Sequence, residues 1–327
     1  MDYEKQLKKY TRAYDIIMER YAQRHIQHMG LGFAIKRIRT LIEYQFLSHY
    51  AAAPPAWRLM LRSLKRDRPL PDFAIVGPIK SGSSDLVSHL LLHPNIIPPL
   101  AKEIFSPEPE TWRPFFPTLQ ERRKREQHVS PALSGFLAPF MHWLRLMERF
   151  HDTCPEAKII ILLRNPVERA YSHWKWDVLL GGKMLESVGY YRDFDAFVDM
   201  ALALYPEMEM DTVCGFPFLQ SGIYYKSVQR WQTKFGREQV LVLDAADYFC
   251  NRTSTLERIQ DFLDIPRAPI AGNAPPVNIN PLKRNPMSAD TRQRLEAFYR
   301  PYNEKLYALL GIDYGWSKKA ERVYSAA

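Results

Sequence analysis

A turn rich in glycine, serine and lysine follows an apolar stretch at residues 73–76. The turn reads Gly77-Pro78-Ile79-Lys80-Ser81-Gly82-Ser83-Ser84. If Ser83 and Ser84 open a helix, their free backbone N–H groups and the positive end of the helix dipole favour an anion. Lys80 adds a full positive charge. The pattern predicts a phosphate-binding turn between a strand and a helix.

The spacing of this turn differs from that of the Walker loop. The Walker loop reads G-x-x-x-x-G-K-[ST], and Gly77 and Gly82 fit its two glycines. Ser83, however, stands where the lysine belongs, and Lys80 comes two residues before the second glycine. We therefore expect Lys80 to approach a phosphate from the loop side, and a P-loop NTPase or kinase is disfavoured. The structural alternative is an ordinary strand, turn and helix with a solvated lysine.

A second group of polar residues follows another apolar run, at residues 158–163. This nearly continuous run is typical of a strand buried on both faces of a parallel sheet. Arg164 comes directly after it, Pro166 is well placed to open a helix, and Ser172 lies two turns along that helix. Ligands of open α/β sheets collect at the carboxyl ends of strands. Arg164 and Ser172 are therefore candidate ligands of a second anion.

A lysine–glutamate pair, Lys102 and Glu103, lies at the end of a short extended run. A carboxylate placed beside a reacting hydroxyl or amine can act as a general base and typically contributes about 10²–10⁴-fold to the rate. The alternative for Glu103 is an exposed loop carboxylate paired with Lys102. Prolines at positions 107, 109, 114 and 117 then mark an irregular region suited to a binding loop.

Apolar periodicity places these groups on alternating strands and helices. Strands are expected at residues 73–76, 158–163 and 239–243, and helices after Gly82, at residues 221–235 and 254–263, and from Ser288 to Gly311. Pro301 is expected to kink or split the last helix. The alternation predicts an α/β fold whose mostly parallel central sheet is flanked by helices. Residues 1–70 are interpreted as a helical N-terminal extension, and residues 71–327 as the main domain.

Composition adds broad limits. The net charge of +9, from 45 basic and 36 acidic residues, suits a polyanionic ligand or simply a soluble basic surface. The basic run at residues 122–125 is interpreted as a solvated face, and no nucleic-acid partner is predicted. Three widely spaced cysteines indicate neither a disulfide framework nor a metal site, and no metal-ligand cluster is apparent.

The expected location is the cytoplasm. No apolar run approaches the roughly 18 residues of a membrane span, and the N-terminus lacks the apolar core of a signal peptide. We expect no stable membrane insertion. The N-terminal helices are expected to pack on the main domain, and contact with a membrane surface through a basic amphipathic face is the sharper alternative.

Three of these segments resemble, in the same order, one enzyme family. The K-x-G-[ST]-[ST] turn at Lys80 resembles the 5'-phosphosulfate loop of the sulfotransferases that use 3'-phosphoadenosine 5'-phosphosulfate (PAPS). The stretch R-N-P-V-E-R-A-Y-S, from Arg164 to Ser172, resembles their 3'-phosphate motif. The block at residues 286–316 resembles the C-terminus of bacterial members of the heparan-sulfate-sulfotransferase-like branch. The resemblance covers residues 72–316.

The resemblance implies a P-loop-like sulfotransferase fold, with PAPS as co-substrate and no metal. It implies that the donor is bound by Lys80, Ser81, Gly82, Ser83, Ser84, Arg164 and Ser172, with a late basic loop contributing Lys283 or Arg284. It also implies that Glu103 is the general base, that Lys80 meets the charge on the departing bisphosphate, and that Lys102 lies beside the sulfonate.

The chain departs from the family pattern beside Glu103. Family members commonly read K-E-x-H-F-F, but this chain has Phe105 where the histidine is usual. That difference weakens any expectation of a helper histidine at this place. His173 is a possible substitute, although a structural role on its helix is favoured.

The leading functional hypothesis is a sulfotransferase acting on a small polar molecule, such as a bacterial secondary metabolite, at a hydroxyl or an amine. A carbohydrate acceptor is the alternative within the class, and a non-catalytic nucleotide-binding protein is the alternative outside it. An oligomer is left open. Candidate pocket-lining residues are Trp112, Trp143, Trp174 and Trp176, and residues that would favour a cationic acceptor are Glu108, Glu110 and Asp177.

Overall fold

The computed structural model describes residues 35, 54–104, 106, 108–139, 141–179, 193–204, 218–270, 280 and 286–316. Phe105, Lys283 and Arg284 lie outside the described residues, so their predicted roles stay predictions. Most of the expected N-terminal extension also lies outside them. The first described helix is α3 (Ala56–Ser63), which follows Pro54-Pro55 as predicted.

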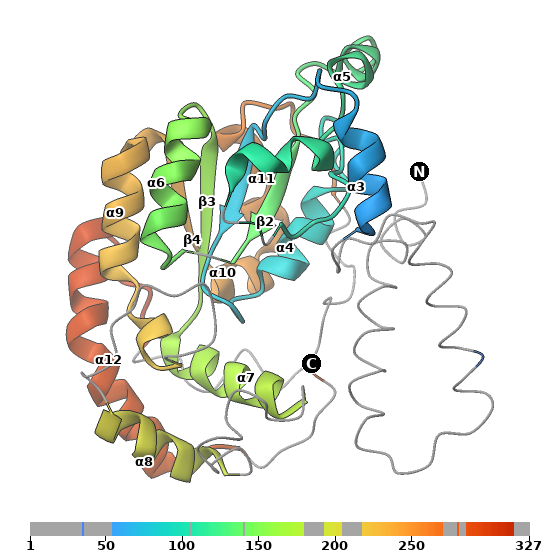
Figure 1. The fold of residues 1–327 in the computed structure, drawn as a ribbon. Helices are drawn as coiled ribbons and strands as arrows, with labels where there is room; N and C mark the ends of the chain where they lie inside the picture. The colour runs from blue at the N-terminus through green and yellow to red at the C-terminus, as the bar shows by residue number, and fades with distance from the viewer. Residues whose placement is uncertain are drawn as a thin grey trace.

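Four parallel strands form the central sheet, in the order β2-β1-β3-β4 (Figure 1). They are β1 (Phe73–Val76), β2 (Gly135–Ala138), β3 (Lys158–Leu163) and β4 (Val240–Asp244). Val76, the last residue of β1, pairs with Ala138 on one side and with Ile161 on the other. The predicted α/β fold is confirmed, and all four strands are parallel. Their carboxyl ends therefore share one edge of the sheet.

Helices cover both faces because the strand side chains alternate between two cores. On one face Val76, Ile159 and Ile161 pack with α6 (Leu144–Thr153), α9 (Tyr225–Phe235) and the short helix η1 (Pro109–Phe115). On the other face Ile75, Ile160 and Leu162 pack with α4 (Ser83–Leu90), α10 (Ala245–Cys250) and α11 (Arg252–Phe262). Each large apolar side chain fully buried in this way contributes about 1.5–3 kcal/mol.

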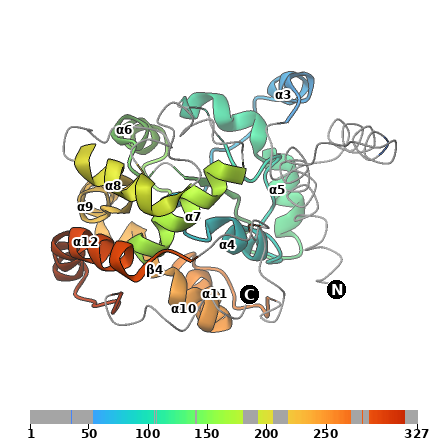
Figure 2. The same ribbon diagram turned by 90° about the horizontal axis from the view of Figure 1, so that it is seen from below.

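A third apolar cluster lies beyond the carboxyl ends of the strands. It is built by α7 (Pro166–Leu179), α8 (Phe194–Leu204), η3 (Gln220–Gly222) and part of α12 (Ala289–Leu310), with Trp174, Phe197 and Tyr299 buried inside it. Figure 1 shows α7 and α8 below the sheet, and Figure 2 shows them from that side. This cluster holds α7 across the edge where β1 and β3 end.

Helix α12 begins and ends where the sequence predicts. The Ser288 hydroxyl caps its start by accepting from the Thr291 backbone N–H at 3.1 Å, and Gly311 ends it in the left-handed conformation, with φ 69°. The expectation that Pro301 splits the helix is wrong, since α12 runs unbroken from Ala289 to Leu310. Proline removes one backbone hydrogen bond, but buried side chains on both sides of Pro301 hold the helix, namely Leu295, Tyr299 and Leu306.

Strand β2 was not predicted. It is short and begins at Gly135, which propensity alone assigns to a turn. A side chain at this position would collide with the ring of Phe73 on the neighbouring strand, which gives the glycine a packing reason. The basic run at residues 122–125 falls in α5 (Leu119–Glu126), where its predicted solvated helix is confirmed, with no residue of the helix buried.

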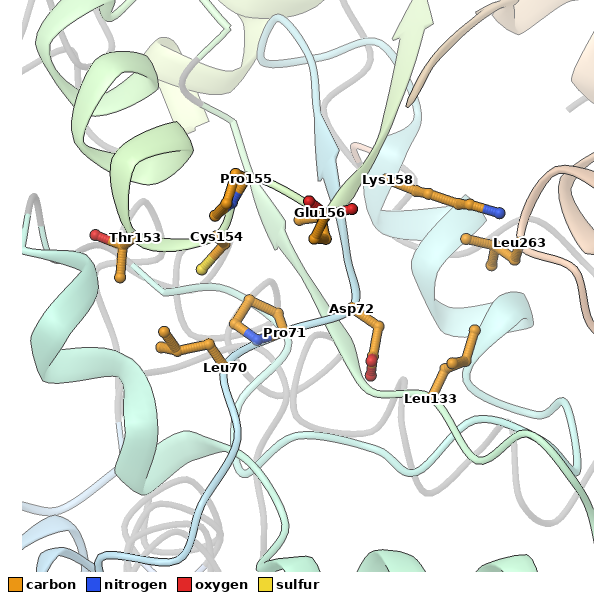
Figure 3. A pocket seen from close by; sticks show the side chains of 11 residues that line it. Leu70, Pro71, Asp72, Leu133, Thr153, Cys154, Pro155, Glu156, Lys158 and Leu263 are labelled. Atoms are coloured by element: carbon orange, nitrogen blue, oxygen red, sulfur yellow. The ribbon is translucent and has the colours of Figure 1, made fainter. Parts of the chain in front are cut away.

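A surface pocket of about 390 Å³ lies at the amino ends of β1, β2 and β3 (Figure 3). Its charged groups already have partners, because Arg122 Nη2 donates to Asp72 Oδ1 at 2.7 Å and Lys158 Nζ donates to the Phe262 carbonyl at 2.7 Å. The pocket is at the end of the sheet opposite to Lys80, and it is separate from the predicted site. Within the described part of the chain, no helix is long and apolar enough to cross a membrane.

Candidate functional site

The turn between β1 and α4 is held in an unusual backbone conformation. Lys80 and Gly82 both have positive φ, 69° and 94°. Gly82 caps α4, and a Cβ there would lie 2.9 Å from the ring of Phe249. Lys80 takes the left-handed region without being glycine, which costs about 1–3 kcal/mol. Arg164 Nη1 donates to the Lys80 carbonyl at 3.1 Å and helps to hold the turn in this shape.

Ser83 and Ser84 open α4, as the sequence predicts. Their backbone N–H groups are in the first helical turn, where the amides have no partner within the helix and the dipole favours an anion. The Ser81 hydroxyl donates to the Pro78 carbonyl at 2.9 Å, so this side chain stabilises the turn. The Ser84 hydroxyl accepts from Lys102 Nζ at 2.9 Å. Direct contacts of these serines with a donor stay predictions.

A buried polar network anchors the first turn of α4 from below. The Tyr248 hydroxyl donates to Asp85 Oδ1 at 2.6 Å, and Arg252 Nη2 lies 3.5 Å from the same oxygen. His89 Nδ1 donates to the Asp85 carbonyl at 2.9 Å. Burial alone would raise the pKa of Asp85, but the hydrogen bonds from His89 and Tyr248 and the charge of Arg252 bring it below its ordinary value. The network joins α4 to α10 and α11.

Lys102 and Glu103 lie beside β2 and reach the same turn. The Leu137 backbone N–H donates to the Lys102 carbonyl at 2.6 Å, and Glu103 forms an isolated parallel bridge with Leu137. Lys102 Nζ lies 2.8 Å from Glu103 Oε1, and the Lys102 side chain has no exposed area. The pair is therefore not a solvated loop contact. Burial lowers the pKa of Lys102, and the Glu103 carboxylate opposes that effect.

Arg164 stands at the carboxyl end of β3, where the sequence places it. The Tyr224 hydroxyl donates to the Arg164 carbonyl at 2.8 Å. The next residue, Asn165, donates through Nδ2 to the Trp316 carbonyl at 3.0 Å. Trp316 Nε1 in turn donates to Asp244 Oδ1 at 3.0 Å. The C-terminal block is thus tied to the ends of β3 and β4.

Helix α7 presents two residues to the site that the sequence reasoning missed. Lys80 Nζ lies 3.8 Å from the centre of the Trp176 ring, within the range of a cation–π contact. Lys175 lies close enough for its charge to act on Lys80. Trp176 follows Ser172 by four residues, so both are on one side of α7. That spacing is the signal by which Trp176 could have been found.

Four cations, Lys80, Lys102, Arg164 and Lys175, come together with one carboxylate, Glu103. Burial and the charge of Arg164 lower the pKa of Lys80 to about 7, with Lys102 and Lys175 acting in the same direction and Glu103 opposing them. An excess of buried or half-buried positive charge is costly unless an anion compensates it. Together with the helix start of α4, this donor set fits a phosphate-bearing ligand.

Three other predicted residues have structural roles. Trp112 and Trp174 are buried in separate cores, with 0% and 2% exposure, so the expectation that they line a pocket is wrong. Their large apolar surfaces are worth more in a core than at an open site. His173 is 1% exposed, stacks on Phe218 with ring centres 3.8 Å apart, and has Nδ1 3.2 Å from Arg169 Nη1. This is the structural role that the sequence favoured.

The remaining predicted residues of the middle region are placed as follows. Trp143 is half-buried at the margin of the core around Phe150. Asp177 is 1% exposed on α7. Glu108 and Glu110 both pair with Arg149, whose Nη2 lies 3.2 Å from Glu110 Oε2. Because one cation already neutralises these two carboxylates, they give little support to a cationic acceptor.

Comparison with known proteins identifies one family. A family model described as "Sulfotransferase domain" matches residues 70–305. The chain is 29% identical over 208 residues to human bifunctional heparan sulfate N-deacetylase/N-sulfotransferase 2, covering 60% of this chain and 22% of that protein. It is 23% identical over 291 residues to human heparan sulfate glucosamine 3-O-sulfotransferase 3A1, covering 82% of this chain and 68% of that protein.

A solved structure agrees. The crystal structure of a sulfotransferase from Alicyclobacillus acidocaldarius is 26% identical, has a TM-score of 0.53, and covers 76% of this chain and 100% of that one. The chain therefore spans the whole of the bacterial structure but about a fifth of the human bifunctional protein.

The affinity for 3',5'-bisphosphoadenosine should fall as the pH rises through 7. Free Lys80 loses its proton near pH 7, whereas a bound anion favours the charged form and raises its pKa. Binding then requires proton uptake, and the association constant should decrease by up to about tenfold per pH unit above 7. Calorimetric titration between pH 7 and 9 avoids the ionisation of the phosphate itself, which lies near pH 6. Lys80→Arg stays charged and should lose this slope; an identical slope in the variant would contradict the assignment.

Replacing Trp176 should shift that pH dependence. The cation–π contact stabilises charged Lys80 by about 0.5–1 kcal/mol, so Trp176→Leu should lower the pH midpoint of bisphosphate affinity by about 0.4–0.7 units. Trp176→Phe keeps an aromatic face and should lie between the leucine variant and the unchanged protein. If leucine and phenylalanine variants lose affinity equally at every pH, the tryptophan acts only by filling space.

Proposed function

Because the chain belongs to the sulfotransferase domain family, we propose that it transfers a sulfuryl group from PAPS to a hydroxyl or an amine of a polar acceptor. The observation that carries this proposal is the convergence of Lys80, Lys102, Glu103 and Arg164 at the start of α4. These residues come from three separate segments of the sequence. Such a site combines anion binding with a carboxylate that can accept a proton.

The donor set suits a ligand with two separated anionic groups. PAPS has a phosphosulfate on the 5' side of adenosine and a phosphate on the 3' side. The turn from Lys80 to Ser84 would hold the first group through backbone N–H groups and the Lys80 ammonium. Arg164 and Ser172 would hold the second, with the loop of Lys283 and Arg284 as a further contributor.

Two residues would share the proton and charge transfers. As the acceptor attacks sulfur, a new bond from sulfur to the acceptor oxygen or nitrogen forms, and the bond from sulfur to the 5'-phosphate oxygen breaks. The acceptor proton passes to the Glu103 carboxylate. The electron pair of the broken bond stays on the phosphate oxygen, where the positive charge of Lys80 stabilises it. Lys102, fixed between Glu103 and Ser84, orients the carboxylate and adds positive charge beside the sulfonate.

The acceptor class is the finer part of the proposal. The names of the two human relatives describe sulfation of heparan sulfate and its glucosamine. These names favour a saccharide with a free hydroxyl or amine, and they move the carbohydrate alternative ahead of a small metabolite. The prediction of a bacterial secondary metabolite stays a prediction, as does a cytoplasmic location.

The donor assignment predicts selective stabilisation by 3',5'-bisphosphoadenosine. At about one hundred times its dissociation constant the ligand should stabilise the protein by about 2.7 kcal/mol, which raises Tm by roughly 5–10 °C without added metal. Thermal denaturation with magnesium and ATP is the comparison, and it should show a much smaller shift. Lys80→Ala should remove most of the response. A larger shift with magnesium and ATP would overturn the donor assignment.

Glu103→Gln should separate catalysis from donor binding. Glutamine has the same shape and its amide oxygen can still accept from Lys102 Nζ, but it is not a base. We expect turnover to fall about 10²–10⁴-fold, while affinity for 3',5'-bisphosphoadenosine changes less than about threefold. The assay is the mass gain of one sulfonate on a glucosamine-containing oligosaccharide with PAPS. Full turnover in the variant would remove Glu103 from the role of base.

A further inference from the structure

Helix α3 carries its apolar side chains on the side that faces solvent. Trp57, Met60, Leu61 and Leu64 are 44%, 62%, 53% and 75% exposed. Their spacing of three, one and three residues puts all four on one side of a helix. We call these four side chains the α3 stripe. A surface helix ordinarily turns such a stripe toward the core, so α3 is inverted with respect to the usual pattern.

The opposite side of α3 is attached to the protein by a cation. Arg62 Nη2 donates to the Phe116 carbonyl at 2.8 Å, and Arg62 Nε donates to the Pro114 carbonyl. Leu59 packs beside it against the core. Burial and the charge of Arg68 lower the pKa of Arg62 to about 10. These contacts fix the rotation of α3, and with it the outward direction of the α3 stripe.

Basic side chains lie next to the α3 stripe. Lys65 and Arg66 follow it directly and are exposed. The Leu119 backbone N–H donates to the Asp67 carbonyl at 2.8 Å, which brings the start of α5 to the end of α3. Figures 1 and 2 show both helices at the same end of the molecule. Helix α5 adds the exposed Arg123 and Lys124, while its Glu121 pairs with Arg68 at 3.6 Å.

We propose that the α3 stripe and its neighbouring cations dock the protein on an anionic lipid surface. Tryptophan and aliphatic side chains enter the headgroup region, and lysine and arginine beside them are attracted to acidic headgroups. A second copy of the chain would bring the same cations face to face, which opposes a symmetric contact. The preceding segment of the chain itself contains Lys36-Arg37-Ile38-Arg39, so its charge also has the wrong sign. Charge complementarity therefore favours the lipid.

Vesicle flotation of the full chain tests this proposal. We expect binding to phosphatidylcholine vesicles that contain about one-third phosphatidylglycerol, little binding to pure phosphatidylcholine, and weaker binding in about 0.5 M salt. Changing Met60, Leu61 and Leu64 together to serine should reduce the partition coefficient at least about tenfold, and Lys65→Glu with Arg66→Glu should do the same. These side chains are exposed, so folding should be unaffected.

A matched control and a local probe keep the outcome clear. Ile312, beyond α12, is 48% exposed, and Ile312→Ser should bind vesicles like the unchanged chain. A solvent-sensitive dye on Leu61→Cys, in a Cys250→Ser background because Cys250 is an exposed thiol, should shift to the blue when the mixed vesicles are added. No binding to the mixed vesicles, or equal binding by the serine variant, overturns the proposal. So does a dye that is already blue without lipid, which would indicate that the chain itself or a second copy covers the α3 stripe.

Discussion

Repulsion among like charges is the constraint around which this site is built. Lys80, Lys102, Arg164 and Lys175 come from different segments, and only Glu103 among them is acidic. The folded protein tolerates the arrangement through specific contacts: the indole of Trp176 under one ammonium, and Glu103 and Ser84 around another. The hydrogen bond from Arg164 to the Lys80 carbonyl adds a geometric lock. The packing of α7 and α12 maintains this cluster, and an incoming anion relieves it.

Local sequence signals identified the parts of the fold that depend on neighbouring residues. The apolar runs of β1 and β3 predict strands because they are buried on both faces, and their bounds match the structure. Ser288 and Gly311 predict the ends of α12 because caps satisfy backbone groups within one turn. The Lys80 turn, Arg164 and the Lys102–Glu103 pair were all found in this way, and the parallel sheet brings them to one edge.

Features that depend on distant residues were missed or misassigned. Gly135 begins a strand because Phe73 lies against it, which cannot be read from residues 135–138 alone. Trp112 and Trp176 look alike in sequence, yet one is enclosed by Phe136 and Phe150 and the other contacts Lys80. Pro301 is tolerated because tertiary contacts on both sides outweigh one lost hydrogen bond. In each case the deciding partner is more than 30 residues away or belongs to the packing of a whole helix.

The buried network around Asp85 has a consequence for the timing of order at the phosphate turn. Tyr248, His89 and Arg252 fix the first turn of α4 from inside the protein, and the ring of Phe249 closes the space beside Gly82. The conformational entropy of this turn is therefore lost when the chain folds rather than when a ligand arrives. A preorganised receptor keeps more of its interaction energy as affinity. Substitutions in α10 and α11, far from any ligand, would then weaken binding by restoring motion to the empty turn.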